Sequence, residues 1–303
     1  MLQTSHFERK YNQITLNKQD DHVPSQLNIF SLFAIIMPMM SRSDIAREIV
    51  LVCQRLAQKG FVTATDGNVS ARLPNGNILT TPTALNKGRV TESDLVEAKA
   101  DGSAVTLSRK PSTELGMHLF IYGERPEVNA VVHAHPPYAT GFATARISLT
   151  ECVFPEVIVS LGAIPLAPYA TPSTNEVAES LAPFVGAADA ILLTNHGVVA
   201  YGNDPEDAYF KLEKVEHAAH IIFVARLLGG EHRLTADQVQ QLRSLSQATY
   251  GKDPSGKTAC DPEIPPGASE GDLKELIRAI LAEQMKSSSP ARSDQQHSVH
   301  RGT

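Results

Sequence analysis

Apolar side chains recur at helical spacing in five stretches between residues 41 and 248. Between Ser41 and Gly60 they return every three or four residues, and Gly60 provides a stop signal, so this stretch is expected to be a helix. The same spacing predicts helices within residues 111–126, 173–186, 204–229 and 235–248. The pattern therefore predicts a protein with substantial helical content and room for a sizeable core.

Shorter runs rich in β-branched residues alternate with these helices and predict strands. The runs "VSARL" and "ILTT" flank Asn75-Gly76, a pair that favours a tight hairpin turn. Further strands are expected at 129–135, at 163–170 and on both sides of a turn at 195–197. Several strand pairs are joined by short turns, and no glycine-rich dinucleotide fingerprint is present. The expected fold class is α/β, a single domain with a central mixed or antiparallel sheet flanked by helices, plus flexible tails.

The two ends of the chain differ from its middle. The apolar stretch "LNIFSLFAIIMPMM" within residues 1–40 is broken by polar residues and proline, and is shorter than the roughly 20 residues of a membrane span. We expect 1–40 to be a disordered extension or to lie upstream of the true start; a weak amphipathic anchor is the alternative. The catalytic domain is expected at 41–251. A Pro/Gly-rich linker, an amphipathic helix and a disordered tail are expected at 252–267, 268–287 and 288–303.

Charge and cysteine content narrow the range of partners. The chain carries 27 basic and 33 acidic side chains, a net charge of −6, and no long basic run, so nucleic acid is not an expected partner. The three cysteines are scattered and lack CxxC pairing, which predicts a reducing, cytoplasmic compartment and argues against disulfides or a thiolate zinc site. Cys53 lies on the apolar side of the first predicted helix and is expected to be a buried, inert thiol.

Three histidines form the candidate metal site. His133 and His135 stand two residues apart on a predicted strand, so their side chains point to the same face at its end. Two histidines of this kind are either metal ligands or strand-end residues bonded to backbone. His196, at the turn after another strand, favours the metal reading, because three neutral imidazoles with an open fourth position suit Zn²⁺. The same cage accepts Co²⁺ or Mn²⁺.

Carbanion chemistry at a metal also needs an acid or base. Glu114 begins a predicted helix and has two readings, a helix-capping acid or a catalytic group. Three candidate ligands elsewhere in the chain favour the catalytic reading. His118, four residues further along the same helix, is expected in a supporting or core position. His217 and His220 are spaced for metal binding, but no third ligand is placed beside them.

Six motifs carry a family resemblance. They stand in the order and spacing of the class II aldolase/adducin family: "GNVSARL", "TPTALNKG", "PSTELGMHL", "NAVVHAH", "PLAPYAT" and "TNHGVVAYG". Residues 42–251 resemble above all its L-fuculose-1-phosphate aldolase branch. The resemblance implies a largely antiparallel sheet and a homotetramer with active sites at subunit interfaces. It also implies that His133, His135 and His196 hold one zinc ion per subunit and that Glu114 is the catalytic acid/base.

The resemblance further implies a loop that binds the substrate phosphate. The matching residues are Gly67, Asn68, Thr83, Ala84, Ser112 and Thr113. Backbone N–H groups of a turn and small hydroxyls near a helix N-terminus suit an anion. A plain turn between strands is the alternative reading of "DGN". The family often has glycine where Ala84 stands, which puts one phosphate contact in doubt.

The aldehyde side of the expected active site departs from the family pattern. The fuculose enzyme has a proton-donating tyrosine in the region that matches 151–162, and this stretch contains none; Phe154 and Glu156 lie near the place. Tyr250 matches the tyrosine of a C-terminal Tyr-Gly pair and is a candidate catalytic residue, with packing as the alternative. The aldehyde-side proton donor and the stereochemistry are therefore open.

The resemblance implies a specific reaction. It is the zinc-dependent cleavage of a small-molecule sugar phosphate, L-fuculose or L-rhamnulose 1-phosphate, to dihydroxyacetone phosphate and L-lactaldehyde. The alternatives are a sugar-phosphate 4-epimerase, a decarboxylase of sugar-acid phosphates or a non-catalytic adducin-like module. The tail at 268–287 resembles encapsulation peptides, which would bind shell proteins of a bacterial microcompartment. A helix docked on its own tetramer and a frayed tail are the alternatives.

Overall fold

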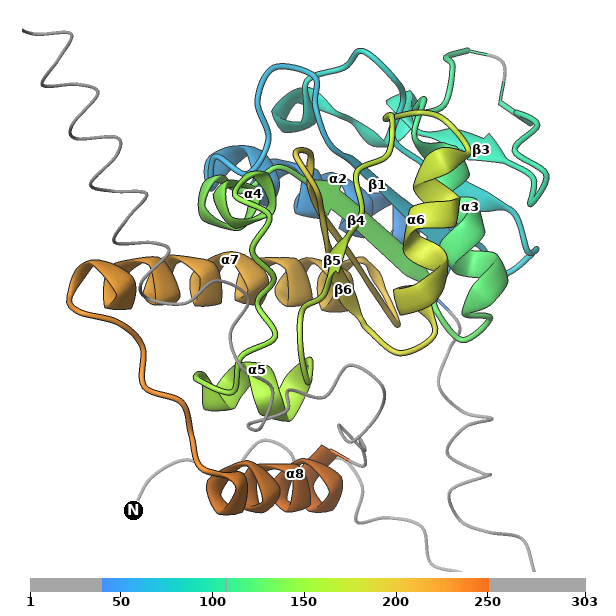
Figure 1. Cartoon of the computed structure of the whole chain (residues 1–303). Helices are drawn as coiled ribbons and strands as arrows, with labels where there is room; N and C mark the ends of the chain where they lie inside the picture. The colour runs from blue at the N-terminus through green and yellow to red at the C-terminus, as the bar shows by residue number, and fades with distance from the viewer. Residues whose placement is uncertain (1–39, 107, 251–303) are drawn as a thin grey trace, which may run out of the picture. The chain divides into compact units, whose positions relative to one another are not determined.

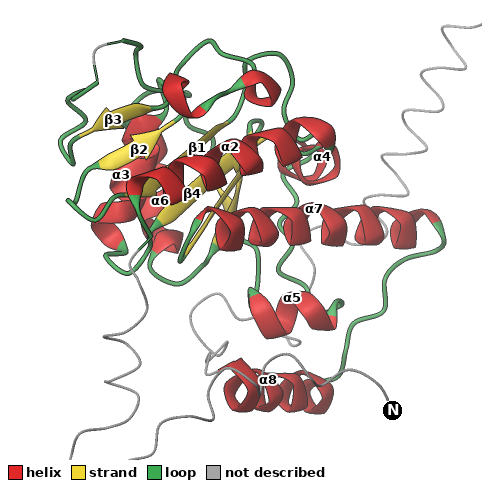
Figure 2. Ribbon diagram, turned by 180° about the vertical axis from the view of Figure 1, so that it is seen from behind, coloured by secondary structure: helices red, strands yellow, loops and turns green. Residues whose placement is uncertain are grey.

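A single sheet organises the part of the chain that the computed structural model describes, residues 40–106 and 108–250 (Figures 1 and 2). Within these residues the sheet has seven strands in the order β3-β2-β1-β4-β7-β6-β5. Neighbouring strands run antiparallel, except that β5 and β6 are parallel. The predicted fold class, a mostly antiparallel sheet flanked by helices, is confirmed.

The elements have the following bounds. The strands are β1 (Asn68–Arg72), β2 (Ile78–Thr80), β3 (Val96–Ala98), β4 (Ala130–Ala134), β5 (Leu166–Ala167), β6 (Ala190–Leu193) and β7 (Gly197–Gly202). The α-helices are α2 (Arg42–Gln58), α3 (Leu115–Glu124), α4 (Pro137–Thr144), α5 (Pro155–Ser160), α6 (Glu176–Val185), α7 (Pro205–Leu227) and α8 (Ala236–Tyr250). Two 3₁₀ turns are η1 (Lys87–Arg89) and η2 (Glu92–Asp94).

Helices cover both faces of the sheet. Helices α2, α4 and α7 pack on one face, whereas α3 and α6 pack on the other (Figure 2). Consecutive strand residues alternate between the two cores: Val132 joins the first and Val131 the second. Strands buried on both faces are mostly apolar, which is the pattern of β4, β6 and β7 apart from His133 in β4. This burial fixes the central strands, and the candidate histidines lie at the end of β4 and beside the start of β7.

The sequence predicted most of these elements and missed a few. The first predicted helix is α2, which begins after Ser41 through a capping box with Asp44. The strand expected at 163–170 is only β5, because prolines at both sides of Leu166–Ala167 have no N–H to extend a ladder. Helices α4 and α5 and strand β3 were not predicted.

Helix α4 is capped by a side chain from another helix. Glu216 of α7 accepts hydrogen bonds from the backbone N–H groups of Tyr138 (3.0 Å) and Ala139 (2.8 Å). Its carboxylate thereby takes up orphan donors of the first turn of α4, just beyond His135. A local sequence pattern does not reveal a cap of this kind, because its partner lies 77 or 78 residues away.

Replacing Glu216 by alanine is expected to destabilise the protein. The substitution leaves two N–H groups without their buried acceptor, so urea denaturation is expected to show a loss of about 1–3 kcal/mol in the free energy of unfolding. Glu213→Ala is the matched control on the same helix. Its carboxylate is a third exposed, pairs with Lys59 and accepts one hydrogen bond from the Tyr209 hydroxyl, so its loss is expected to stay at about 1 kcal/mol or less. Equal losses for the two variants would speak against the cap.

Two cysteines behave differently from each other. Cys53 is a free, fully buried thiol, as expected, and burial raises its pKa to about 12. Cys152 is disulfide-bonded, which corrects the expectation of reduced thiols. Spacing along the chain could not reveal this bond, since the fold decides which cysteines meet.

Several expectations concern the ends of the chain. Residues 1–39 of the expected extension, the linker at 252–267, the helix at 268–287 and the tail at 288–303 lie outside the described residues. Among the helices that are described, none has both the length and the apolar character needed to cross a bilayer.

Candidate active site

The two histidines of the HxH motif lie at the end of β4. His133 belongs to the strand and pairs in register with Val199 of β7, while His135 follows it and donates its backbone N–H to the carbonyl of Phe61 (2.9 Å). The turn that carries His196 approaches this strand end closely. A side chain at Gly197 would meet the Ala134 carbonyl at 2.5 Å and the His135 ring at 2.6 Å. Glycine is therefore required there for the third histidine to reach the first two.

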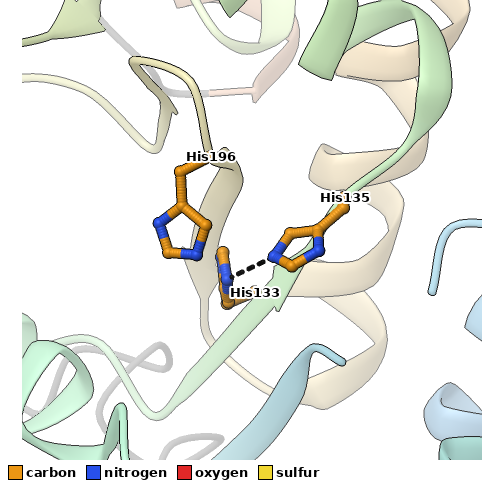
Figure 3. Close-up of side chains that lie close together, drawn as sticks. All are labelled: His133, His135 and His196. Carbon is orange, nitrogen blue, oxygen red and sulfur yellow. Dashed lines mark hydrogen bonds between the residues drawn. The ribbon is translucent and has the colours of Figure 1, made fainter. Parts of the chain in front are cut away.

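The three imidazoles converge on one point (Figure 3). Their ring centroids lie 4.7 to 5.1 Å apart, and one nitrogen of each lies within 4.8 Å of the others. The Nε2 atoms of His133 and His135 are 3.1 Å apart. Two imidazole nitrogens bound to one tetrahedral zinc ion are expected about 3.3 Å apart. The spacing of this pair therefore fits a shared cation.

The hydrogen bonding of His133 prepares its ring for a metal. Its Nδ1 lies 2.9 Å from the carbonyl of Val198, and a carbonyl only accepts, so Nδ1 carries the proton. The lone pair then lies on Nε2, which faces the cluster. Burial lowers the pKa of both His133 and His135 to about 4, so both rings are neutral near pH 7, the form that ligates metals. Without a metal, Nε2 of His135 donates the hydrogen bond to this lone pair that Figure 3 marks, whereas a cation between the rings would take the lone pairs of both nitrogens.

Glu114 completes the cluster. It occupies the N-cap position of α3, but its carboxylate forms no described capping bond and turns toward the histidines. Oε1 lies 3.2 Å from Nε2 of His196, Oε2 lies 3.5 Å from Nε2 of His133, and Oε2 accepts a 2.8 Å hydrogen bond from Asn68. Burial alone would raise its pKa, but the imidazoles of His133 and His196 and the Asn68 amide hold it well below the usual range. The group is therefore an ionised carboxylate aimed at the candidate metal position.

A buried polar chain supports the base of α3. The Ser70 hydroxyl bonds both Nδ1 of His118 (2.7 Å) and the Tyr122 hydroxyl (2.9 Å). His118 is almost fully buried, and burial lowers its pKa to about 4. Its Nε2 and the Oδ1 of Asn68 are buried without a partner among the described residues. His118 thus has the supporting core position that its spacing from Glu114 suggests.

The residues of the expected phosphate loop come from three segments: Gly67-Asn68 is the first, Thr83-Ala84 the second and Ser112-Thr113 the third. Gly67 has a left-handed φ of +72°, and a Cβ there would lie 2.9 Å from the His133 carbonyl. Thr83 donates its N–H to the Lys110 carbonyl. This contact brings the second segment beside the third, Ser112-Thr113, at the start of α3. The Asn68–Glu114 bond joins the first segment to the metal cluster.

Two details of these segments bear on the expected departures. Ala84 has φ +55°, a conformation that glycine adopts without strain, which explains why glycine suits this position. The Ser112 hydroxyl accepts from the N–H of Glu114 (3.2 Å), and the Thr113 hydroxyl accepts from Ser173 (3.0 Å). Ala84 thus adopts a left-handed conformation at the position where the resemblance leads us to expect glycine.

The remaining candidates do not join the cluster within the described residues. Phe154 is the N-cap residue before α5 and packs near His217, and His220 stacks on Tyr138 with ring centroids 3.9 Å apart. His217 and His220 therefore face aromatic rings. Glu156 lies in the first turn of α5. Tyr250 is the last residue of α8, and its side chain lies outside the described part.

Sequence reasoning missed two contacts of the cluster. Asn68 was assigned only to the phosphate, yet its amide bonds Glu114. Asp66 lies 3.8 Å from Nδ1 of His135 and was not singled out. Its place in "DGN", beside the expected loop, was the available signal. Such pairings depend on how β1 and β4 align, which the sequence alone does not specify.

The buried imidazoles give the metal-free protein a defined pH dependence. His118, His133 and His135 have a pKa of about 4 in the folded chain, against an ordinary 6.5. Between these values the unfolded chain binds more protons, so stability is full above pH 6.5 and falls as the pH drops toward 4. Urea unfolding of chelator-treated protein is expected to show a slope on the order of 1 kcal/mol per pH unit for each group. A flat profile across this window would contradict the buried, neutral assignment.

A carboxylate that faces three converging imidazoles is the arrangement of a metal-assisted acid–base enzyme. Comparison with known sequences then identifies the family. The family described as Class II Aldolase and Adducin N-terminal domain matches residues 47–223, more than half of the chain. The chain belongs to the class II aldolase and adducin family, whose aldolases are metal-dependent lyases.

Named relatives support this assignment. The chain is 32% identical over 207 residues to 3-oxo-tetronate 4-phosphate decarboxylase of Escherichia coli K12, covering 66% of this chain and 96% of that protein. It is 35% identical over 178 residues to L-fuculose phosphate aldolase of Methanococcus maripaludis, covering 58% and 95%. A solved L-fuculose 1-phosphate aldolase structure superposes with a TM-score of 0.63 at 29% identity, covering 68% and 97%. Similarity to both kinds of enzyme supports a lyase and leaves the substrate to be proposed.

Proposed function

We propose that the chain catalyses zinc-dependent retro-aldol cleavage of L-fuculose 1-phosphate, L-rhamnulose 1-phosphate or both. The products are dihydroxyacetone phosphate and L-lactaldehyde. One observation carries the proposal: His133, His135 and His196 converge within reach of the Glu114 carboxylate. The similarity to L-fuculose phosphate aldolase supports the substrate class.

The four residues fit a bound divalent cation. Three neutral imidazoles would hold it, and the proton on Nδ1 of His133 fixes that ring in the ligating tautomer. When bound, zinc supplies Lewis-acid stabilisation of the negative charge that develops on substrate oxygens as the C3–C4 bond breaks. Co²⁺ or Mn²⁺ could serve in the same cage.

Glu114 moves the proton on the dihydroxyacetone phosphate side. As the C3–C4 bond breaks, its electron pair stays with C3, and the C4 hydroxyl loses its proton as C4 becomes the aldehyde carbon. The net change is the transfer of one proton from the C4 hydroxyl to C3: Glu114, ionised in the free protein, takes up a proton as the hydroxyl loses one and delivers it to C3, and in the reverse direction it removes the proton from C3. The Asn68 amide holds the carboxylate at Oε2, and Oε1 faces Nε2 of His196, so the group is fixed beside the candidate metal position. Tyr250 is the candidate for the proton on the aldehyde side.

The phosphate lies, in this proposal, against the three segments that meet beside Glu114. They contain Gly67, Asn68, Thr83, Ala84, Ser112 and Thr113. The contacts among these segments, and the hydrogen bond from Asn68 to Glu114, support a phosphate bound at a fixed distance from the metal position. A fixed distance between phosphate and metal would place the reacting carbons near the cation, and this orientation contributes to the rate.

Product analysis tests the proposal. Zinc-loaded full-length protein is incubated with L-fuculose and L-rhamnulose 1-phosphates, and dihydroxyacetone phosphate and L-lactaldehyde are quantified. Equimolar release of both products is expected from at least one substrate. Epimerised sugar phosphate without release of aldehyde would replace the proposal with an epimerase, and binding without turnover would indicate an adducin-like module.

Decarboxylation of a sugar-acid phosphate is the second candidate. The 32% identity to 3-oxo-tetronate 4-phosphate decarboxylase favours it, as does the absence of tyrosine from residues 151–162. Loss of CO₂ from that substrate also leaves dihydroxyacetone phosphate, so the metal, Glu114 and the phosphate loop would serve both reactions. The difference is the leaving fragment, because CO₂ carries no hydroxyl proton to remove. Release of CO₂ from the sugar-acid phosphate, with no aldehyde from the ketose 1-phosphates, would favour the decarboxylase.

The assembly and location form a further part of the proposal. We infer a homotetramer in the cytoplasm, with residues 41–251 as the catalytic domain. Exposed apolar side chains near the end of α7 support a subunit contact: Ile221, Phe223, Val224, Leu227 and Leu228. Residues 268–287 are proposed to direct the enzyme to microcompartment shell proteins, since their apolar stripe follows a Pro/Gly-rich linker. Diffuse fluorescence of a 268–287 fusion in shell-forming cells would contradict this.

A further inference from the structure

A buried lysine lies between two of the phosphate-loop segments. Lys87 begins η1 and is only 2% exposed. Its ammonium group donates to the carbonyls of Thr65 and Leu85, both at 2.8 Å. Thr65 is two residues before Gly67, and Leu85 directly follows Ala84. The Lys87 ammonium group therefore links the segment 64–68 ("ATDGN") to the segment 81–85 ("TPTAL").

No carboxylate in the described residues lies within ion-pairing distance of Lys87. Its partners are neutral carbonyls, whereas the buried Lys211 pairs with Asp189 at 2.8 Å and Asp207 at 3.3 Å. Burying a charge is costly unless it is paired or solvated. Burial accordingly lowers the pKa of Lys87, although the nearby charges of Asp66 and Glu114 favour its protonated form. When Lys87 is protonated, its positive charge is therefore held next to the two loop segments without a directly bonded carboxylate.

The neighbouring Asn86 strengthens the same link. Its amide donates to the carbonyl of Ala64 at 2.7 Å. Ala64 and Ala84, one in each segment, have left-handed φ values of 48° and 55°. Such conformations are strained for alanine and persist only where surrounding contacts enforce them. Bonds from Asn86 and Lys87 provide those contacts.

The direction of these bonds matters for an anion. In a trans peptide unit the C=O and N–H groups point in opposite directions. The carbonyls of Ala64, Thr65 and Leu85 turn toward Asn86 and Lys87. The N–H groups of the same peptide units therefore point away from the lysine. The N–H of Asp66 donates to the Thr63 carbonyl, whereas no described hydrogen bond engages the N–H groups of Thr65 and Asn86. These two donors, with a cation on the opposite side of their peptide units, suit an anion.

We propose that Lys87 is a specificity-determining residue, which holds the two loop segments together and adds the positive charge that favours phosphorylated over unphosphorylated ligands. The inference rests on the proposed function only in taking the substrate phosphate as the natural ligand. Lys87 acts through the loop and need not touch the reacting atoms. It is therefore a positioning residue for the reaction.

The test uses inorganic phosphate as the probe, with zinc-loaded full-length protein in calorimetric titrations. Lys87→Met removes the charge at similar size, and Lys87→Gln removes the charge but keeps a hydrogen-bond donor. Lys99→Met removes one positive charge from an exposed position and is the matched control. Both Lys87 variants are expected to bind phosphate roughly 10- to 100-fold more weakly, and the control within about twofold of the parent. Zinc content and melting temperature verify the fold of each variant.

A kinetic comparison separates charge from structure. With the sugar phosphate, the Lys87 variants are expected to raise KM more than they lower kcat, while turnover of the free sugar stays near that of the parent. Unchanged phosphate affinity in folded Lys87→Gln overturns the proposal, and so does failure of both variants to retain zinc, because either result makes the lysine a purely structural link. If the parent binds phosphate but cleaves neither sugar phosphate, weaker binding in the variants still supports Lys87 and counts only against the proposed substrates.

Discussion

Replacing Glu114 by glutamine is expected to lower kcat for sugar-phosphate cleavage roughly 10²- to 10⁴-fold, the usual contribution of a positioned acid or base. The amide has nearly the same shape as the carboxylate but cannot carry the proton. Bound zinc is expected to remain, because the three imidazoles are unchanged. Turnover and metal content are measured on the same preparation.

Glu124→Gln is the matched control for this experiment. Glu124 lies at the other end of α3 and is exposed, so the same substitution there is expected to leave kcat within about twofold, since surface changes of this kind are near neutral. A Glu114→Gln enzyme with parental kcat would show that another group transfers the proton. If the Glu114→Gln enzyme loses both zinc and activity, the main role of Glu114 would instead be to bind the metal.

Replacing His133 by alanine is expected to produce the second large effect, the loss of the metal. Removing a partner that merely orients a ligand typically costs 10- to 100-fold in metal affinity, so removal of a ligand is expected to cost more than about 100-fold. His133 is also fully buried within β4, so some loss of stability accompanies the change. Zinc affinity by competition with a chelator, and cleavage activity, are the measurements.

His217→Ala provides the comparison for the metal experiment. His217 is exposed on α7 and packs near Phe154, away from the converging imidazoles. Its removal is expected to leave zinc affinity and activity within about twofold, since it makes no described contact with the cluster. If His217→Ala loses zinc and His133→Ala keeps it, the metal site has been assigned to the wrong histidines.

The existence of the central strands and the place of the histidines could be predicted from local patterns. Alternation along a strand puts His133 and His135 on one face, and glycine after His196 permits the close turn that the structure shows. The family resemblance then indicated which loops meet. These features are predictable because they depend on short-range spacing.

Other features depend on contacts between distant residues. Whether Glu114 caps α3 or faces the histidines is decided by its side-chain direction and by Asn68, 46 residues away. Helix α4 was missed because its cap, Glu216, comes from another helix. Lys87 stands in an ordinary polar motif, and only the fold shows that it is buried between two loops. Local periodicity carries no information on such pairings.

The most direct test of the metal centre is X-ray absorption spectroscopy at the zinc edge on reloaded, dialysed protein. We expect one zinc ion per chain, with three imidazole nitrogens at about 2.0–2.1 Å and only oxygen or nitrogen in the remaining position. Absence of bound zinc after dialysis, sulfur in the coordination shell or fewer than three imidazoles would contradict the proposed site.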